Sequence, residues 1–420
     1  MIALLSASAI VAITIALIII QPRGLNEAWA ATGGALAMLL CGFATLGDLA
    51  RVTREVSDVL LFLVGMMTLT AAVERSGLFD LLALRTARAA RGSGILLFLG
   101  IFGLGFAITA LLSLDVTVLV LTPIVYALTA RLRIAPLPYL FVCALIANVG
   151  SLLLPISNLT NLLAYGLLGL SFAHFARLLA LPQLAALVAT IGLLYLLFRR
   201  QIPRRFDPTD LPERPEGAEP GFLRLAALVL MVVLAALLIV GTLGRPIALP
   251  ALLGGAIMGA IAVRRGAATV RTLAGDVSWS LLPFVIGMFT IIRGAERIWL
   301  DRLGGGVNLG TGGLPDLLRI GFVAAFGANL INNIPMIGAL IGLLGNAAPP
   351  AREPLALAAL LGVNLGSIVT PFGSLATLLW LAIIRRKGVQ LSSLGYMRVS
   401  IVIAPPTLLS ATLALWLVLR

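Results

Sequence analysis

Uncharged apolar runs recur along the whole chain, and they constrain the possible folds more than any other feature. A bilayer core of about 30 Å takes roughly 20 apolar residues per helix, so most of these runs are expected to cross a membrane once. Charged residues make up only 11% of the chain, against about 25% in soluble domains. The runs are Ile2–Ile20, Ala28–Gly47, Val59–Val73, Gly92–Leu114, Val116–Ala130, Ile134–Ala176, Leu178–Phe198, Leu225–Gly244, Pro246–Val263, Val277–Ile292, Ile320–Ala351, Pro354–Ile384 and Val399–Leu419. We therefore expect an all-α polytopic membrane protein.

One sizeable hydrophilic segment, Arg199–Gly221, divides the chain nearly in half. Its acids, prolines and clustered Arg residues are typical of a flexible linker rather than of a packed domain. The positively charged positions that would share one side with it are 75–91, 131–133, 264–271, 385–398, Arg23 and Arg224. Together with the segment itself, they hold two thirds of the Lys and Arg residues. Positive charge is in excess on cytoplasmic loops. The sequence thus predicts halves 1–198 and 223–420, joined by a cytoplasmic linker at 199–222, with both chain ends outside.

An internal repeat relates the two halves. Phe62–Thr68 (FLVGMMT), followed by Glu74, returns as Phe284–Thr290 (FVIGMFT), followed by Glu296. A second block, which begins NxGSxxxP at Asn148, returns at Asn364. Each half then contains five transmembrane helices, one of them broken, and a re-entrant helical hairpin. Five crossings is an odd number, so the halves should be inverted repeats, which is the architecture of secondary transporters with a binding site at the midplane.

The second repeated block predicts a broken helix in each half, at 148–161 and at 364–377. Proline and glycine interrupt helices, and irregular backbone at membrane depth survives only where it is buried in protein or lines a cavity. The polar side chains there are candidates for substrate binding: Asn148, Ser151, Ser157 and Asn158 in the first break, and Asn364, Ser367, Thr370, Ser374 and Thr377 in the second. The alternative interpretation is that they are polar contacts between packed helices.

The turns of the two hairpins should face these breaks. The first turn contains Asp115 and Thr117, and the second contains Asn332 and Asn333, which join the candidates for substrate binding. Asp115 is the one carboxylate that falls deep within an apolar run, and an intramembrane acid marks an ion or proton pathway by default. We expect Asp115 and Thr117 to serve proton coupling. The alternative is that Asp115 caps the helix at the turn.

Other chemistry finds little support in the sequence. No phosphate-binding loop with its lysine is present, and no His-Glu-x-x-His motif, so neither ATP hydrolysis nor metalloprotease activity is expected. Cys41 and Cys143 show no metal-ligand spacing, and no cofactor or metal is expected. The net charge of +13 sits mostly between apolar runs, so it indicates loop anchoring beside lipid rather than nucleic-acid binding. A carrier is favoured over an enzyme or a channel.

These blocks resemble the ArsB family of bacterial arsenite and antimonite efflux carriers. The resemblance covers nearly the whole chain and is most specific at Leu61–Leu78, Leu153–Leu162 and Asn364–Gly388. It implies a multi-pass protein of the bacterial inner membrane that exports trivalent arsenic and antimony in exchange for protons, with an arsenical-pump ATPase as an optional partner. Leu159 and Thr160 depart from the small residues that are more usual in the family after the first break.

The chemistry of the cargo fits these residues. Trivalent arsenic is the uncharged As(OH)3 at neutral pH, so amides and hydroxyls could hold it by hydrogen bonds without displacing the hydration of a charge. A neutral cargo needs another source of energy, which the proton at Asp115 would supply during alternating access. The alternative is a Na+/H+ antiporter or a Na+-coupled carboxylate carrier of the same superfamily, because sodium could also bind to carbonyl and amide oxygens at the breaks.

Overall fold

The computed structural model describes residues 2–20, 22, 26–209, 211–215, 217–303, 310–344 and 347–420. Regular structure within these ranges is helical, apart from one isolated bridge between Ser93 and Arg205. Nine of the described helical stretches are long and apolar enough to cross a bilayer, and four shorter apolar helices accompany them. The prediction of an all-α polytopic membrane protein is confirmed at this level.

The elements before the hydrophilic segment form a continuous series. They are α1 (Ile2–Ile20), α2 (Glu27–Leu40), α3 (Leu46–Glu74), α4 (Leu78–Ala89), α5 (Gly94–Leu111), α6 (Leu114–Val116), η2 (Thr117–Leu121), α7 (Thr122–Arg131), α8 (Leu137–Val149), η3 (Pro155–Ser157), α9 (Leu159–Leu168) and α10 (Phe172–Phe198). The helix pair α5–α7 turns at Leu112 and Ser113, and α8 and α9 form the first interrupted helix.

A similar order of elements follows that segment. They are α11 (Pro220–Thr242), α12 (Ala248–Arg264), α13 (Val270–Asp276), α14 (Leu281–Leu303), α15 (Leu314–Ile331), α16 (Asn333–Leu344), α17 (Pro349–Leu361), η4 (Gly362–Gly366), η5 (Ser367–Val369), η6 (Pro371–Gly373), α18 (Leu375–Arg386) and α19 (Ser393–Val418). The pair α15–α16 turns at Asn332, and α17 and α18 form the second interrupted helix.

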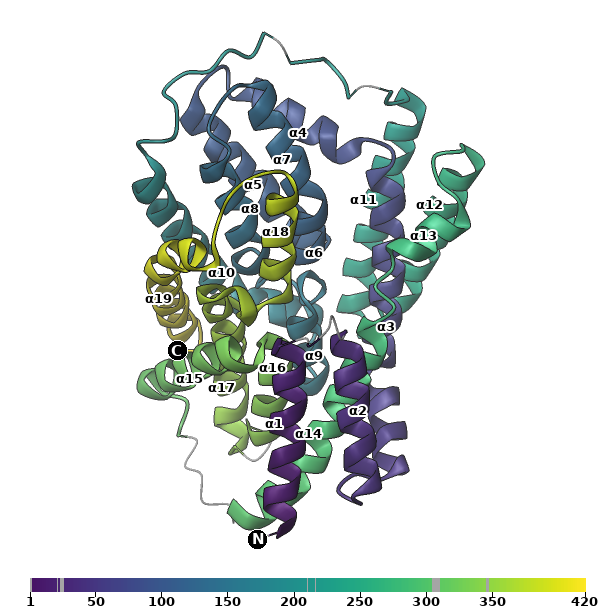
Figure 1. Cartoon of the computed structure of the whole chain (residues 1–420), viewed down its shortest axis with the longest axis vertical. Coiled ribbons are helices and arrows are strands. Elements are labelled where there is room, and N and C mark those ends of the chain that lie inside the picture. Colours follow the sequence, from purple (N-terminus) through teal and green to yellow (C-terminus); the bar gives the residue numbers. More distant parts are fainter. Residues whose placement is uncertain are drawn as a thin grey trace.

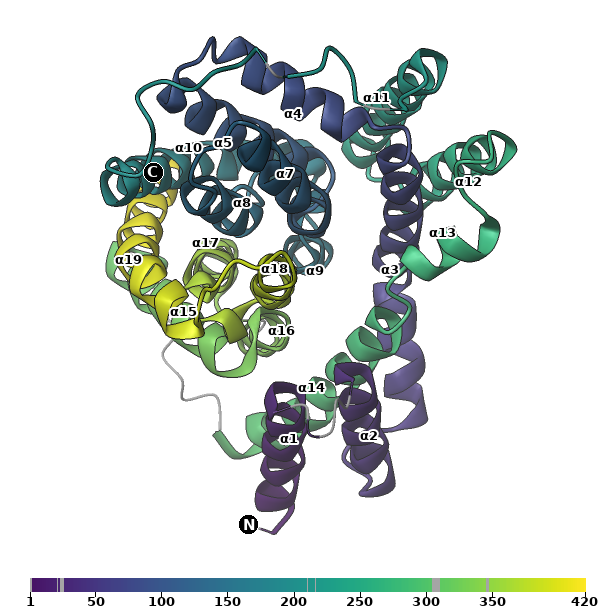
Figure 2. The same cartoon turned by 45° about the horizontal axis from the view of Figure 1, so that its top comes forward.

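The helices assemble into two groups, which Figures 1 and 2 show from two directions. Helices α1–α3 and α11–α14 form an elongated group, here called the arc, in which α3 packs on α12 and α2 packs on α14. The hairpins, the interrupted helices and α10 with α19 form a rounded group, here called the bundle (Figure 2). The arc meets the bundle where α14 packs on α16 and α3 on α9. Both interrupted helices therefore lie in the bundle.

Helix α3 is much longer than the apolar run Val59–Val73 that predicted it. It begins at Leu46 and takes up a charged stretch that the sequence analysis placed outside the membrane. The charges are held by neighbours: the Glu55 carboxylate lies 3.1 Å from the Arg293 guanidinium of α14, and Asp58 accepts hydrogen bonds from two backbone N–H groups at the start of α12. Pairing of charges across helices explains why a count of charges in one run predicted too short a helix.

Repeated glycines let the arc pack closely. Gly65 of α3 lies against the backbone of Ala251 in α12, where no side chain would fit. Gly287, its counterpart in the repeat, faces α2, and a Cβ there would lie 2.8 Å from the carbonyl carbon of Ala31. Glycine is required at both positions because two helices approach each other there without room for a methyl group.

The hydrophilic segment is more ordered than the flexible linker that its composition predicted. The side chains of Ile202, Phe206 and Leu211 are buried. The Phe206 N–H donates to the Gly92 carbonyl (2.8 Å), and the Arg88 guanidinium donates to the Leu211 carbonyl (3.1 Å). The segment is therefore docked on α4 and the start of α5, because three apolar side chains gain burial there. Arg23, one of the positive charges that predicted the orientation, lies outside the described residues.

Candidate functional site

The two interrupted helices meet inside the bundle (Figure 2). Helix α8 ends at Val149 and α9 begins at Leu159, while α17 ends at Leu361 and α18 begins at Leu375. Both predicted interruptions are therefore present. Every backbone polar group freed by an interruption needs a partner in an apolar environment. The side chains that supply those partners define the candidate site.

A hydrogen-bonded network joins the first interruption to the second. The Asn364 side chain is at its centre: its Oδ1 accepts from Thr160 Oγ1 (2.6 Å) and from Asn158 Nδ2 (3.2 Å), and its Nδ2 donates to Asn161 Oδ1 (2.7 Å). Asn158 Nδ2 also donates to Ser151 Oγ (3.2 Å). All five side chains are buried, with exposed fractions of 4% or less. The structure thus brings the predicted residues Ser151, Asn158 and Asn364 together.

Gln183 of α10 supports the first interruption. Its Oε1 accepts from the backbone N–H groups of Leu152 (3.0 Å) and Leu153 (3.2 Å), and its Nε2 donates to the Val149 carbonyl (2.8 Å). These are backbone groups that an uninterrupted α8 would satisfy internally. Gln183 was not among the predicted site residues. The available signal was a single amide side chain in the otherwise apolar run Leu178–Phe198.

Asn329 of α15 supports the second interruption in a comparable way. Its Nδ2 donates to the Gly366 carbonyl (2.7 Å), and its Oδ1 accepts from the Thr370 N–H (2.8 Å). Tyr396 and Ser400 of α19 donate to two carbonyls of η5, at 2.9 and 2.8 Å. The second interruption is therefore fixed by a hairpin and by the last helix, and none of these three residues was among the predicted site residues.

The turn of the first hairpin lies beside α8. The short helix α6, which carries Asp115, packs against α5 and α8, and the Ser113 hydroxyl caps it by accepting from the Val116 N–H (3.4 Å). Thr117 Oγ1 lies 2.7 Å from Thr109 Oγ1 across the turn. Asp115 is partly buried, and its carboxylate has no hydrogen bond or ion pair to any side chain or backbone group in the described part of the chain. The first hairpin turn therefore carries a carboxylate without a partner among the described residues.

The turn of the second hairpin lies against the second interruption. Asn332 adopts a left-handed backbone conformation (φ +74°), and its Nδ2 donates to the Phe372 carbonyl (3.1 Å). Asn333 follows as the first residue of α16 and is buried. The hairpin turn and η6 are thus bonded to each other, as the facing arrangement predicted.

The other predicted residues contribute locally or are unsatisfied. Ser157 donates to the Ala110 carbonyl of the first hairpin (2.8 Å), and Ser367 donates to the Asn364 carbonyl (3.2 Å). Thr370 accepts from the Gly373 N–H (3.2 Å), which closes a turn within the second interruption, and Ser374 precedes α18 without a side-chain cap. Asn148 and Thr377 are buried within the bundle but make no side-chain hydrogen bond there.

A cavity of about 620 Å³ separates the arc from the bundle, and we call it the far cavity. It is bordered by α3 and α14 of the arc and by α9, α16 and α17 of the bundle. Glu55 and Arg293, which pair with each other, and Arg352 contribute its charges. It reaches Leu162 and Leu163, the two residues that follow Asn161 in α9. The hydrogen-bonded network therefore lies close to this opening.

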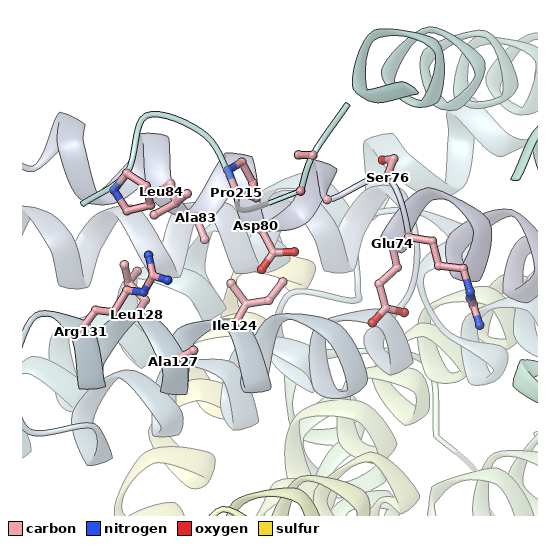
Figure 3. A pocket seen from close by; sticks show the side chains of 15 residues that line it. Glu74, Ser76, Asp80, Ala83, Leu84, Ile124, Ala127, Leu128, Arg131 and Pro215 are labelled. Carbon is pink, nitrogen blue, oxygen red and sulfur yellow. The ribbon is translucent and has the colours of Figure 1, made fainter. Parts of the chain in front are cut away.

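A second cavity of about 390 Å³ lies at the end of the molecule that carries the hydrophilic segment, and we call it the linker-end cavity (Figure 3). It lies between α4 and α7, with Glu74 of α3 at one side and Pro215 of the hydrophilic segment above it. The carboxylate of Asp80 points into it. Glu55 and Glu74 are 19 residues apart on α3 and hence separated by about 28 Å, so the two cavities lie at different levels along this helix.

Comparison with known proteins identifies the kind of protein to which this site belongs. A family model described as "Arsenical pump membrane protein" (ArsB) matches residues 6–419. The chain belongs to this family. The resemblance read from the sequence blocks is thereby confirmed, and an arsenical pump membrane protein is a multi-pass transport protein and not an enzyme, as the sequence predicted.

Individual relatives of the ArsB family match over nearly their full length. The arsenical pump membrane protein of Escherichia coli (strain K12) is 33% identical over 421 residues, which cover 98% of each chain. That of Yersinia enterocolitica is 32% identical over 422 residues, again 98% of each chain. Among solved structures, the Alcanivorax borkumensis YdaH transporter shares the fold, with a TM-score of 0.57 at 16% identity over 88% of this chain and 86% of the other.

Proposed function

We propose that the protein exports arsenite, As(OH)3, and antimonite from the bacterial cytoplasm in exchange for protons. The observation that carries the proposal is the buried network around Asn364, which is built from amides and hydroxyls and joins the two interrupted helices. Such a network offers both donors and acceptors but no formal charge. It suits a small neutral trihydroxy solute better than an ion.

We further propose that the chain consists of two inverted repeats, 1–198 and 223–420, joined by a cytoplasmic linker at 199–222. The repeated sequence blocks and the similar order of elements in the two halves support this organisation. Each repeat would contribute five transmembrane helices, one of them broken, and a re-entrant hairpin. Two related halves can exchange inward-open and outward-open shapes around one midplane site, as in other secondary transporters.

Asp115 is the group that we assign to proton coupling, with Thr117 beside it. The supporting observations are its position at the hairpin turn next to α8 and the absence of an ion-pair partner among the described residues. Protonation from outside would accompany release of the cargo, and loss of the proton to the cytoplasm would reset the carrier. The working location is the bacterial inner membrane, where lipid surrounds the spans and an arsenical-pump ATPase is an optional partner.

Transport by the purified protein in vesicles with an imposed pH gradient tests the proposal. Arsenite movement should follow the gradient and stop when the gradient is dissipated. Asp115→Asn should abolish the gradient-driven component, while Asp207→Asn, which alters an exposed acid of the hydrophilic segment, should keep it. Wild-type rates in Asp115→Asn would refute the role of Asp115. Flux that stops when potassium replaces sodium in the assay would favour the sodium-coupled alternative.

A further inference from the structure

Buried polar side chains without a hydrogen-bond partner gather in one region. Across the described ranges, the fully buried side-chain atoms that lack a partner are Asn148 Nδ2 and Oδ1, Thr377 Oγ1 and Trp380 Nε1. All three side chains have an exposed fraction of 0%. A buried polar group without a partner is costly, and native proteins keep few of them, so each needs an explanation.

The three residues lie on helix surfaces that face each other. Thr377 and Trp380 are three residues apart on α18 and therefore share one face of it. Phe141 and Asn148 are seven residues apart on α8 and likewise share a face. The Phe141 and Trp380 rings are in contact, with centroids 5.5 Å apart, and α8 packs against α18. The unsatisfied groups thus border the same interface between the two halves of the chain.

Aromatic rings surround one end of this interface, and the hydrogen-bonded network lies at the other. Phe141 stacks on Tyr396 (5.9 Å) and contacts Phe198 (5.2 Å), and Trp380 also contacts Tyr396 (5.8 Å). Toward the interruption, the Ser151 hydroxyl donates to the Asn148 carbonyl (2.7 Å) and accepts from Asn158. The interface is therefore continuous with the site around Asn364 but has its own donors and acceptors.

The chemistry of the unsatisfied groups defines what they could bind. Asn148 offers one acceptor and a donor amide, the Thr377 hydroxyl offers both functions, and the Trp380 indole N–H is a donor only. None carries a charge, and the Asn148 amide and the Trp380 indole present N–H donors as well as an acceptor, so the set suits a neutral solute better than a cation or an anion. A small neutral molecule with several hydroxyl groups can satisfy all of them, because each hydroxyl is both a donor and an acceptor.

We propose that Asn148, Thr377 and Trp380 form a second cargo subsite between α8 and α18, adjacent to the network around Asn364, for a neutral polyhydroxy solute such as As(OH)3. The proposal rests on the proposed function and adds Trp380 as a residue that determines affinity for the cargo. In the orientation proposed above, this subsite lies on the cytoplasmic side of the interruptions. Cargo would occupy it before it reaches Asn364.

Removal of the unsatisfied groups gives a test that a structural role cannot mimic. Trp380→Phe keeps an aromatic ring but removes the indole N–H, and Thr377→Val keeps the shape of the side chain but removes the hydroxyl. Because the Thr377 hydroxyl has no hydrogen-bond partner, the melting temperature of Thr377→Val without arsenite should equal or exceed that of the wild type. Trp380→Phe also makes a fully buried ring smaller, so its melting temperature should fall for that reason alone. The KM for arsenite should rise by about three- to tenfold in each variant, with a smaller change in kcat.

Two matched controls separate the subsite from general effects. Trp29→Phe makes the same change on α2, where Trp29 is 72% exposed. Thr412→Val makes the same change at a buried threonine whose hydroxyl donates to the Leu408 carbonyl of its own helix (2.8 Å). Neither control should alter the KM for arsenite. Arsenite should also quench the tryptophan fluorescence of the detergent-solubilised wild type but quench Trp380→Phe less.

The outcomes are distinct. An unchanged KM in both Trp380→Phe and Thr377→Val would overturn the subsite, as would a lower melting temperature of Thr377→Val, since that would show a structural role for the hydroxyl. If the wild type moves no arsenite under a pH gradient, the proposed function fails instead. The fluorescence titration would then test the subsite by itself, because it measures binding without transport. Arsenite and a neutral triol such as glycerol are the two solutes to titrate. Quenching by neither solute would overturn it.

Discussion

Asn364 bonds one interrupted helix to the other, and its side chain has three hydrogen-bond partners to lose. Replacement by Ala leaves the Thr160 hydroxyl, an Asn158 amide hydrogen and the Asn161 carbonyl oxygen without their present partner. An unsatisfied buried polar group costs roughly 1–3 kcal/mol, and water admitted to the space recovers part of that. We expect Asn364→Ala to lower the melting temperature and to abolish arsenite transport.

Asn26→Ala provides the comparison, because Asn26 caps α2 through a single bond to the Ala28 N–H (2.9 Å). Loss of a helix cap costs about 1 kcal/mol, and transport should persist. A melting temperature for Asn364→Ala at or above that of Asn26→Ala would contradict the structural importance of the network. Thermal unfolding in detergent and vesicle transport supply the two measurements.

Asp80, in the linker-end cavity, allows a prediction about pH. Burial raises the pKa of this carboxyl group above its ordinary value of about 4. The folded state therefore disfavours the ionised form, and this cost appears as the pH rises through and above that ordinary value. Asp80→Asn should raise the melting temperature at pH 7, and the gain should shrink as the pH falls toward 4.

Asp207 should show the opposite sign. The Thr209 hydroxyl and N–H donate to its carboxylate, and these bonds lower the pKa of Asp207. Its ionised form is favoured in the folded state, so its contribution is present at neutral pH and is lost on acidification. Asp207→Asn should leave the melting temperature at pH 7 unchanged or slightly lower. A higher melting temperature at pH 7 in both variants would show that the burial of Asp80 is not the cause of the increase in Asp80→Asn.

At the scale of single elements, an interrupted helix is stable only with help from a neighbour. Gln183 of α10 supplies two acceptor contacts and one donor contact to the backbone between Val149 and Leu153. Gln183→Leu keeps most of the volume but removes all three. We expect the melting temperature to fall and the KM for arsenite to rise, because the backbone that positions Ser151 and Asn158 loses its support.

Gln183→Glu distinguishes positioning from packing. The carboxylate keeps the contacts to the two N–H groups but faces the Val149 carbonyl without a hydrogen, so it should recover part of the loss at most. Leu184→Ala, at a residue of α10 that is 56% exposed, should leave the KM unchanged. If Gln183→Leu retained the wild-type KM, Gln183 would be a packing residue only.

The interruptions were predictable from the sequence, but their partners were not. Proline, glycine and repeated Asn and Ser residues mark 148–161 and 364–377 locally, and a local signal survives in one sequence. Gln183 and Asn329 act across tertiary contacts, and a single amide in an apolar run gives no indication of what it faces. The charged start of α3 was missed for the same reason, since Glu55 is paired with Arg293 from another helix. The docking of the hydrophilic segment could not be predicted from its composition, because its three buried apolar residues are spread over ten positions.

At the scale of the whole molecule, both cavities border the surface between the arc and the bundle. Helix α3 lines both of them, through Glu55 in the far cavity and Glu74 in the linker-end cavity. The network around Asn364 lies within the bundle, close to the far cavity. A displacement of the bundle along α3 would move the network away from the far cavity and toward the linker-end cavity, which is the kind of change that alternating access requires.

This arrangement predicts the side from which each cavity can be reached. Ile341→Cys places a thiol in the far cavity, and Ala127→Cys places one in the linker-end cavity, where Ala127 is exposed. With the hydrophilic segment in the cytoplasm, a membrane-impermeant thiol reagent should label Ile341→Cys in intact spheroplasts and Ala127→Cys only in everted vesicles. Both substitutions belong in a Cys41→Ser background, because Cys41 is exposed while Cys143 is buried.

Adding arsenite or a proton gradient extends this experiment, since the labelling rates in the two cavities should change in opposite directions. An arsenite gradient or a proton gradient that favours one shape should raise the labelling rate at one cysteine and lower it at the other, because one opening closes as the other widens. The Cys41→Ser parent supplies the background signal. Labelling of both cysteines from the same side would contradict the orientation, and gradients that changed the two rates in parallel would contradict movement of the bundle along the arc.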